Sequence, residues 1–218
     1  MSYTALIPMR GGSKSIPNKN IKKFGGKPLC YWTIKAAIES KFITDVYVSS
    51  DSDKILKISK GISKKIKIIK RLDKLAQDNS STEDVLLDFS NSIDFENLIT
   101  IQTTSPFTSS KNIDEAIHIY KKNKLDSLFT AVRSKRFYWS DNIKPINYNP
   151  KKRVMRQNFK GTLMENGAFY ITKKGILVKH KCRLGGKIGV YEMDNIHSLE
   201  LDELDDWNIM SKKIKSKI

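Results

Sequence analysis

The sequence contains little cysteine, little histidine and no long apolar run, and each shortage excludes a class of protein. Its 218 residues include 2 Cys and 3 His, with none of the spacings typical of zinc sites or disulfide scaffolds. No segment approaches the roughly 20 apolar residues that span a bilayer, and the first residues do not resemble a secretion signal. We therefore expect a cytoplasmic protein with no membrane partner, in which Cys30 and Cys182 stay reduced.

Acidic residues are also scarce, since 23 Asp and Glu stand against 40 Lys and Arg and give a formal net charge of +17. Such an excess favours an anionic partner, whether nucleic acid, a membrane surface or a polyanionic small molecule. Many of the lysines alternate with apolar residues in periodic segments, which is typical of a solvated surface. No zinc knuckle, helix-turn-helix or aromatic RNA-binding signature occurs. A basic nucleic-acid-binding module therefore stays an alternative, and we expect no nucleic-acid partner.

Alternating apolar patterns organise most of the chain. Short apolar runs predict strands over residues 4–7, 46–48, 66–69, 98–102, 127–132, 167–171 and 187–193. Helical spacing of apolar residues predicts helices over residues 29–40, 55–62, 80–93, 113–120 and 204–214. Ser80, three residues before Glu83, predicts the N-cap of the third helix. This alternation is typical of a mostly parallel, Rossmann-like sheet covered on both faces, a three-layer α/β/α sandwich.

The pattern breaks between residues 133 and 165. Basic and aromatic residues and two prolines, Pro145 and Pro150, replace the periodicity there. A segment of this length inside a domain is usually functional, oligomeric or disordered. We call it the excursion, and we expect one domain over residues 1–218 that contains it.

The loop after the first predicted strand has the composition of a polyphosphate cradle. Gly11 and Gly12 let the backbone approach a ligand closely, and Arg10, Lys14 and Lys19 surround the same turn with positive charge. Loops at the carboxyl ends of parallel strands form the binding crevice of such a sheet. Neither the Walker spacing nor the dinucleotide fingerprint is present. An ordinary basic surface loop is the alternative.

Two carboxylates near the end of the chain suggest a cation site. Glu200 and Asp202 alternate with Leu199 and Leu201, so a strand would place both carboxylates on one face, about 7 Å apart. Paired oxygen ligands suit Mg²⁺ held against phosphate oxygens. The alternative is a solvated acidic edge.

Several motifs together resemble one family. These motifs are Arg10-Gly-Gly-Ser-Lys14, Gln102-Thr-Thr-Ser-Pro106, Glu165-Asn-Gly-Ala-Phe-Tyr170 and His197-Ser-Leu-Glu-Leu-Asp202. In this order they resemble the CMP-N-acylneuraminate (sialic acid) synthetases, above all the catalytic domain of the animal-type enzymes, over residues 4–207. The resemblance implies a nucleotidyltransferase fold and a homodimer in which one subunit's excursion helps to wall the other's sugar site.

The activity implied is transfer of CMP from CTP to N-acetylneuraminate or a related nonulosonic acid, with release of diphosphate. Legionaminate, pseudaminate and Kdo are alternative sugars. The resemblance also implies a role for each matching residue. The CTP-binding residues would be Arg10, Gly11, Gly12, Ser13, Lys14, Lys19, Asn20, Arg71 and Ser80, with Arg10 and Lys14 also catalytic. The sugar-binding residues would be Gln102, Arg153, Arg156, Gln157, Asn166 and Tyr170. Glu200 and Asp202 would hold Mg²⁺, with Mn²⁺ as the alternative ion.

Some of these residues have a second interpretation. Ser80 is equally expected as a plain N-cap, and Tyr170 as the core residue of a strand. The chain also departs from the family pattern at three positions, of which Ser15, where glycine is usual, is expected to matter little. Glu200 stands where aspartate is usual, and Met155 replaces the first of two adjacent arginines. A paralogue without catalytic activity is therefore a further alternative.

Overall fold

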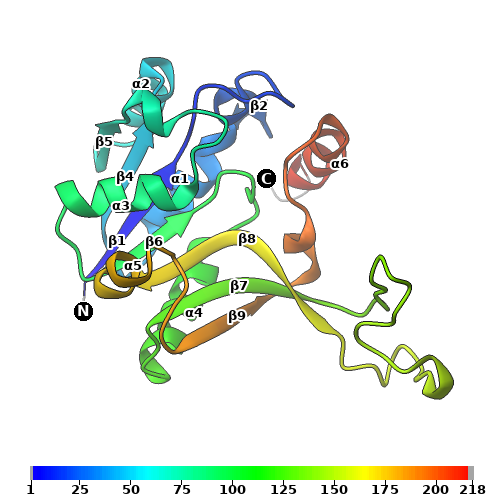
Figure 1. Ribbon diagram of the computed structural model, residues 1–218. Helices are drawn as coiled ribbons and strands as arrows, with labels where there is room; N and C mark the ends of the chain where they lie inside the picture. The colour runs from blue at the N-terminus through cyan, green and yellow to red at the C-terminus, as the bar shows by residue number, and fades with distance from the viewer. Residues whose placement is uncertain (1, 216–218) are drawn as a thin grey trace.

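The computed structural model describes residues 2–215, and a seven-stranded sheet forms its centre. The strands are β1 (Tyr3–Pro8), β4 (Ile43–Ser50), β5 (Ile66–Lys70), β6 (Asn97–Ile101), β7 (Ser127–Ser134), β8 (Thr162–Lys173) and β9 (Ile188–Met193). Their order across the sheet is β5-β4-β1-β6-β8-β7-β9, and all pairs are parallel except those that β8 makes with β6 and β7. The predicted mostly parallel sheet is therefore confirmed (Figure 1).

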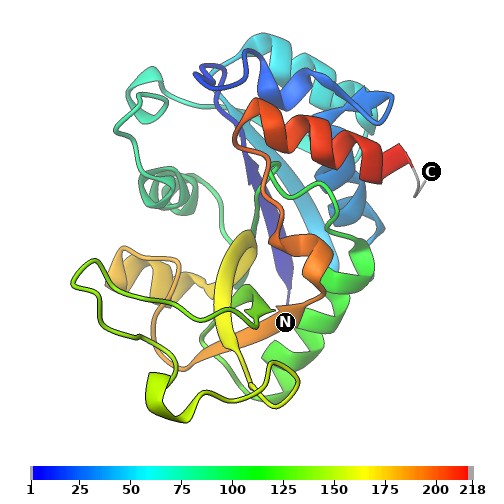
Figure 2. The same cartoon turned by 90° about the vertical axis from the view of Figure 1, so that its right-hand side faces the viewer.

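Helices cover both faces of this sheet. They are α1 (Leu29–Glu39), α2 (Asp53–Ile62), α3 (Thr82–Ser92), α4 (Ser110–Lys122), α5 (Lys174–His180) and α6 (Leu204–Lys215). Apolar residues of α1, α2 and α4 pack against one face, while Leu86 and Phe89 of α3 and Leu177 of α5 pack against the other. Figure 2 views the sheet nearly edge-on, with α3 and α5 on one side and α4 on the other. The three-layer α/β/α sandwich is confirmed.

The last helix packs beside the sheet, on a small core of its own. Trp207, Met210 and Ile214 of α6 contact Phe24, which belongs to a hairpin of β2 (Lys23–Phe24) and β3 (Lys27–Pro28). Gly25 turns this hairpin with a φ of +58°, and a Cβ there would lie 2.9 Å from Ile214 Cγ2. The position therefore requires glycine both for its backbone conformation and for the close approach of α6.

The start of α3 corrects the predicted N-cap by one residue. Ser81 is the N-cap: its hydroxyl accepts from the Asp84 amide at 3.0 Å, and the Asp84 carboxylate accepts from the Ser81 amide at 3.1 Å. Ser80 instead donates to the Lys74 carbonyl at 3.0 Å and accepts from the Gln77 amide at 3.1 Å. The sequence offers two overlapping capping patterns, Ser80 with Glu83 and Ser81 with Asp84. Because the Ser80 hydroxyl is engaged in the preceding loop, the helix starts one residue later than predicted.

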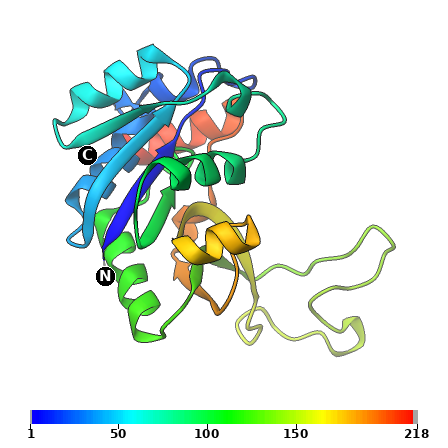
Figure 3. The same cartoon turned by 60° about the vertical axis from the view of Figure 1, so that its left-hand side comes forward.

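The excursion is shorter than predicted, because β7 extends to Ser134 and β8 begins at Thr162. It therefore spans residues 135–161 and extends away from the sheet, in yellow-green in Figure 3. Aromatic rings hold it together, since Phe137 stacks on Tyr148 with ring centres 4.1 Å apart and the Arg153 guanidinium lies 4.8 Å from the Phe137 ring centre. Its short 3₁₀ turn covers Pro150–Lys152.

Two further expectations concern the chain as a whole. Cys30 and Cys182 are both unpaired, as predicted. Between residues 2 and 215, no helix is both long and apolar enough to cross a bilayer.

Candidate functional site

A pocket of about 330 Å³ opens at the carboxyl ends of β1, β5 and β6. Five residues predicted from the sequence meet in its lining: Arg10, Asn20, Arg71, Ser80 and Gln102. The rest of the lining is formed by Pro8, Leu75, Gln77, Asp78, Ser81, Thr82, Val85 and Thr104. Residues from the three segments that follow β1, β5 and β6 thus converge where the strand order predicts the binding crevice.

The glycine loop after β1 is tied to the end of the neighbouring strand. The Met9 amide donates to the Ser49 carbonyl at 2.8 Å, and the Gly11 amide donates to Asp51 Oδ1 at 2.9 Å. A Cβ at Gly11 would lie 3.0 Å from both Asp51 Oδ2 and Ser52 Cβ, so a larger residue would crowd this contact. At Gly12 a Cβ would meet nothing within 4 Å. The fold therefore uses Gly11 itself, while it leaves the space around Gly12 open to a ligand.

Two predicted cations of this loop share one carboxylate. Arg10 pairs with Asp78 at 3.1 Å, and Lys14 pairs with the other oxygen of Asp78 at 2.5 Å. The hydrogen bond from Lys14, with the charges of Lys14 and Arg10, holds the pKa of Asp78 below its ordinary value. Asp78 lies on the pocket lining, so the two cations gather around an anion at the mouth of the pocket. A phosphate group would find the same two partners there.

Asn20 braces two of the pocket loops against each other. Its amide nitrogen donates to the Arg10 carbonyl at 3.0 Å, and its oxygen accepts from the Thr103 hydroxyl at 2.7 Å. Both polar groups of this buried side chain are thereby engaged. Asn20 is placed to hold the loop of Arg10 in position beside Gln102.

Arg71 forms part of the pocket floor. It is 6% exposed and donates to the Ser49 carbonyl at 2.9 Å and to the Ser49 hydroxyl at 3.3 Å. Burial lowers the pKa of its guanidinium, an effect that the nearby Asp51 carboxylate opposes. The hydrogen bond to the Ser49 carbonyl fixes one edge of the planar guanidinium of Arg71. This group is therefore held rigidly where it lines the pocket.

The segment that carries Glu200 and Asp202 lies against the glycine loop but is not a strand, so the predicted strand is wrong. Lys19 Nζ donates to the Leu201 carbonyl at 2.9 Å and contacts Asp202 Oδ1 at 3.2 Å, while the Ser15 hydroxyl donates to the Asp202 carbonyl at 2.6 Å. Loop side chains thus take the backbone groups that a neighbouring strand would have used. The two carboxylates still lie beside the loop of Arg10 and Lys14.

Glu200 lies in an acidic environment. Burial raises its pKa, and the charges of Asp202, Glu165 and Asp206 raise it further. Gly167, with a φ of +61°, places its backbone so close that a Cβ there would be 3.5 Å from Glu200 Oε1. Within residues 2–215, no three carboxylate, histidine or cysteine side chains are grouped to hold a metal ion by themselves.

Asn166 and Tyr170 of β8 are both engaged inside the protein. Asn166 is buried and donates to the His197 carbonyl at 3.0 Å, which fixes the 3₁₀ turn Asn195–Ser198 on the strand. The Tyr170 hydroxyl donates to the Glu165 carboxylate, and burial raises its pKa. The backbone amide of Gln102, in turn, donates to the Ala168 carbonyl at 3.0 Å, so β8 contacts the pocket loop after β6 directly.

The remaining predicted sugar residues lie in the excursion, outside the pocket of Arg10 and Gln102. Arg153 and Arg156 line a hollow of about 650 Å³ together with Phe137 and Met155. Gln157 lies beside them, with its amide 3.6 Å from Met155 Sδ. The structure therefore separates the predicted sugar-binding residues: Gln102 lies in the pocket, Asn166 and Tyr170 lie on β8, and the other three lie on the excursion.

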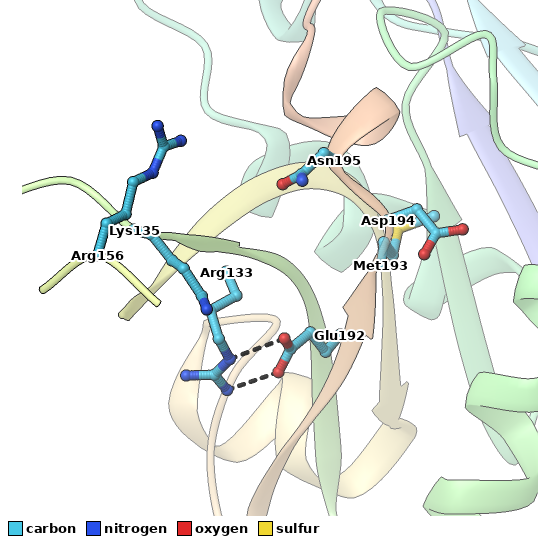
Figure 4. Close-up of a pocket in the computed structure, with 7 residues that line it drawn as sticks. All are labelled: Arg133, Lys135, Arg156, Glu192, Met193, Asp194 and Asn195. Carbon is cyan, nitrogen blue, oxygen red and sulfur yellow. Dashed lines mark hydrogen bonds and ion pairs between the residues drawn. The ribbon is translucent and has the colours of Figure 1, made fainter. Parts of the chain in front are cut away.

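Arg156 also lines a smaller hollow, of about 330 Å³, at the base of the excursion (Figure 4). Here Arg133 of β7 makes two hydrogen bonds to Glu192 of β9, and Lys135 and Asn195 lie near Arg156. Arg133, Lys135 and Asn195 could not be singled out from the sequence, because only the pairing of β7 with β9 brings them together. Asp78 was not singled out either, although the loop that holds it joins a predicted strand to a predicted helix.

Comparisons with known proteins agree with this architecture. The family model described as "Cytidylyltransferase" matches residues 4–215. The chain is 37% identical to N-acylneuraminate cytidylyltransferase A of Danio rerio and 34% identical to N-acylneuraminate cytidylyltransferase of Oncorhynchus mykiss. These alignments cover 97% and 96% of the chain and 50% of each relative, so the chain spans about half the length of these curated relatives. The solved structure of CMP:2-keto-3-deoxy-manno-octonic acid synthetase complexed with CTP is similar in fold, with a TM-score of 0.75, 13% identity and 100% of both chains covered.

Proposed function

The chain belongs to the cytidylyltransferase family, and from this premise we propose that it transfers CMP from CTP to the anomeric hydroxyl of N-acetylneuraminate or a related nonulosonic acid. The observation that carries the proposal is the pocket at the carboxyl edge of the sheet, where Arg10, Arg71, Ser80 and Gln102 converge. The N-acylneuraminate cytidylyltransferases among its relatives support the choice of sugar.

The proposed reaction is an in-line displacement at the α-phosphorus of CTP. The oxygen of the anomeric hydroxyl forms the new bond to phosphorus, the bond to the bridging oxygen breaks, and diphosphate leaves with that oxygen. The hydroxyl proton passes to solvent. Such phosphoryl chemistry depends on positioning and on charge neutralisation more than on covalent participation by the protein. Arg10 and Lys14, released from Asp78, would bind the diphosphate portion and offset the charge that develops on it.

Glu200 and Asp202 fit a divalent cation shared with the substrate. Burial raises the pKa of Glu200 and neighbouring carboxylates raise it further, and a bound cation would stabilise the charge of the whole group. Mg²⁺ commonly takes one or two protein carboxylates and completes its shell with water and substrate phosphates, so a pair of ligands suffices. Bound there, Mg²⁺ or Mn²⁺ would supply charge neutralisation at phosphate oxygens. Lys19 contacts Asp202 and the Leu201 carbonyl, and it would keep the acidic segment against the glycine loop.

We further propose a homodimer in which the excursion of one subunit completes the sugar site of the other. The excursion would contribute Arg153, Arg156 and Gln157, in addition to Gln102, Asn166 and Tyr170 of the sheet. The excursion exposes large apolar side chains, a pattern that marks interaction surfaces. They are Trp139, Ile143, Ile146, Val154 and Met155. The unpaired cysteines support a cytoplasmic location for this enzyme.

The test is diphosphate release with CTP and Mg²⁺ across a panel of N-acetylneuraminate, its deaminated analogue, legionaminate, pseudaminate and Kdo. We expect release with N-acetylneuraminate or a close analogue, and none with UTP in place of CTP. Replacement of Asp202 by Ala should lower turnover by at least about 100-fold, because a partner of the charged phosphates is lost. If no sugar gives diphosphate release while CTP still binds, the proposal is contradicted and a non-catalytic paralogue is favoured.

A further inference from the structure

Arg183 makes contacts that connect the nucleotide side of the molecule to β8. It lies in the loop between α5 and β9, and its side chain is 18% exposed. Its Nε donates to Glu83 Oε1 at 2.6 Å and its second terminal nitrogen donates to Glu83 Oε2 at 2.9 Å. The centre of its guanidinium also lies 4.7 Å from the centre of the Tyr170 ring. One planar group therefore binds a carboxylate edge-on and an aromatic ring face-on.

Glu83 lies in the first turn of α3, beside the pocket that Arg10 and Gln102 line and that we propose binds CTP, called here the nucleotide pocket. Ser81, Thr82 and Val85, immediately around it, all line that pocket. Burial alone would raise the pKa of Glu83, but the hydrogen bonds and charge of Arg183 hold it below the ordinary 4.5. The ion pair therefore fixes the pocket end of α3 to the loop that contains Arg183.

Tyr170 carries the connection to the other side of the site. It pairs with Thr100 of β6, two residues before Gln102, and its hydroxyl donates to Glu165. Glu165 is one of the charges that raise the pKa of Glu200. Contacts thus lead from the first turn of α3 through Arg183 and Tyr170 to Glu165, whose charge acts in turn on Glu200.

This ion pair differs from the others that the structure describes. Apart from it, the described residues contain one doubly hydrogen-bonded arginine–carboxylate pair, Arg133 with Glu192, whose side chains are 29% and 44% exposed against 18% and 25% here. The anchoring of α3 does not depend on the pair, because Leu86 and Phe89 pack on Leu177. Loss of Arg183 should therefore leave the helix folded while its first turn loses its fixed orientation.

We propose that Arg183 is a positioning residue, which holds the first turn of α3, and with it the Ser81–Val85 wall of the nucleotide pocket, in register with β8. It does not touch the nucleotide itself. This inference rests on the proposed function, because it assumes that the pocket takes CTP. A lysine at this position would keep the charge but could not form the two-pronged bond to Glu83 while it also lies over the Tyr170 ring.

The experiment measures the dissociation constant for CTP by calorimetry on the full chain, together with the melting temperature. Arg183→Met should weaken CTP binding by about tenfold and Arg183→Lys by about fivefold, since each loses the planar contact to Glu83. Lys173→Met is the matched control: Lys173 lies on β8 as Tyr170 does, but at the opposite edge of the sheet, where it pairs with Asp126 at 2.7 Å. CTP affinity should stay unchanged in this control.

The outcomes of this experiment separate the explanations. A merely structural Arg183 would lower the melting temperature and the amount of active protein, and so the apparent kcat, without a change in the dissociation constant or KM for CTP. That result, or wild-type affinity in both Arg183 variants, overturns the inference. If Glu83→Gln adds little further loss to Arg183→Met, the two residues act as one unit, as expected for contacting partners. Failure of the wild-type chain to bind CTP would instead refute the proposed function.

Discussion

The pocket at the carboxyl edge of the sheet and the excursion are held in place in different ways. Around the pocket, backbone groups and short side chains of the sheet's own loops fix one another, as Gly11 does with Asp51 and Asn20 with Thr103. The excursion is held mainly by its own rings, as in the stack of Phe137 on Tyr148. The first site is therefore prebuilt by the sheet. The second is a semi-independent surface with exposed apolar side chains, which a second subunit could order.

This difference suggests a division of labour. The pocket at the carboxyl edge of the sheet would bind CTP, the substrate common to all cytidylyltransferases. The excursion would bind the sugar, which varies among them. Loops on a rigid scaffold commonly carry such variable functions. Changes in the two regions should then have separable effects on CTP and on sugar.

The largest effect is expected from Arg10→Ala. Loss of a cation aimed at the charge of the triphosphate should lower kcat/KM by about 100-fold or more. The check is the initial rate of diphosphate release at saturating sugar, with the melting temperature as a control for folding. Turnover near that of the wild type would remove Arg10 from the mechanism and weaken the distinction between the two regions.

Gly12→Ala should weaken CTP binding by about tenfold without a change in the melting temperature, because the added methyl meets no protein atom but enters the space proposed for phosphates. Gly25→Ala is the control that should affect stability instead of binding. The φ of +58° at Gly25 and the 2.9 Å approach of its Cβ position to Ile214 Cγ2 are required by the packing of α6. We expect that variant to lose about 1–2 kcal/mol of stability and to keep its CTP affinity. Equal CTP affinity in wild type and Gly12→Ala would argue against a phosphate cradle.

Phe137→Ala tests the excursion directly. It removes the ring that stacks on Tyr148 and lies under Arg153, so the KM for the sugar should rise by about fivefold. The dissociation constant for CTP should not change, and the free energy of unfolding should fall by less than about 1 kcal/mol, since this ring lies outside the main cores. A comparable loss of CTP affinity would show that the two regions are not separable.

The smallest effect concerns pH. The folded state holds the pKa of Glu83 below 4.5, so the stabilisation from its charge is complete above that value and is lost as pH falls through the lowered pKa. Glu83→Gln should therefore cost about 1 kcal/mol at neutral pH and much less in strong acid. Glu192→Gln breaks the more exposed ion pair near the excursion. It should lower the folding stability at neutral pH in the same way, but by a smaller amount. Urea denaturation across pH measures both, and a larger effect at Glu192 would reverse the expected order.

Periodicity predicted the sheet and its main helices well, because buried strands and amphipathic helices leave regular apolar patterns. It missed α5 and the β2–β3 hairpin, which are too short to show a period. The reversed direction of β8 was also invisible, because β8 reaches its place between β6 and β7 only after the excursion. Local patterns determine which segments are regular, while pairing partners depend on contacts far apart in the chain.

The site was predictable where motifs act locally and not where distant segments meet. The loop of Arg10 to Asn20 and the position of Gln102 were found because both follow strands of the sheet. The strand proposed for Glu200 and Asp202 failed, since Lys19 and Ser15 take its backbone carbonyls instead. Arg183 could not be found at all, because its partner Glu83 lies 100 positions away in the sequence.

The most direct test of the division between the two regions removes the excursion. Ser134 pairs with Thr162 across the antiparallel β7–β8 ladder, so an Asn-Gly turn can replace residues 135–161. We predict that this shortened chain binds CTP within about threefold of the full chain, and that it releases no diphosphate with any sugar. Loss of CTP binding in a folded shortened chain, or sugar-dependent release that persists, would contradict the account.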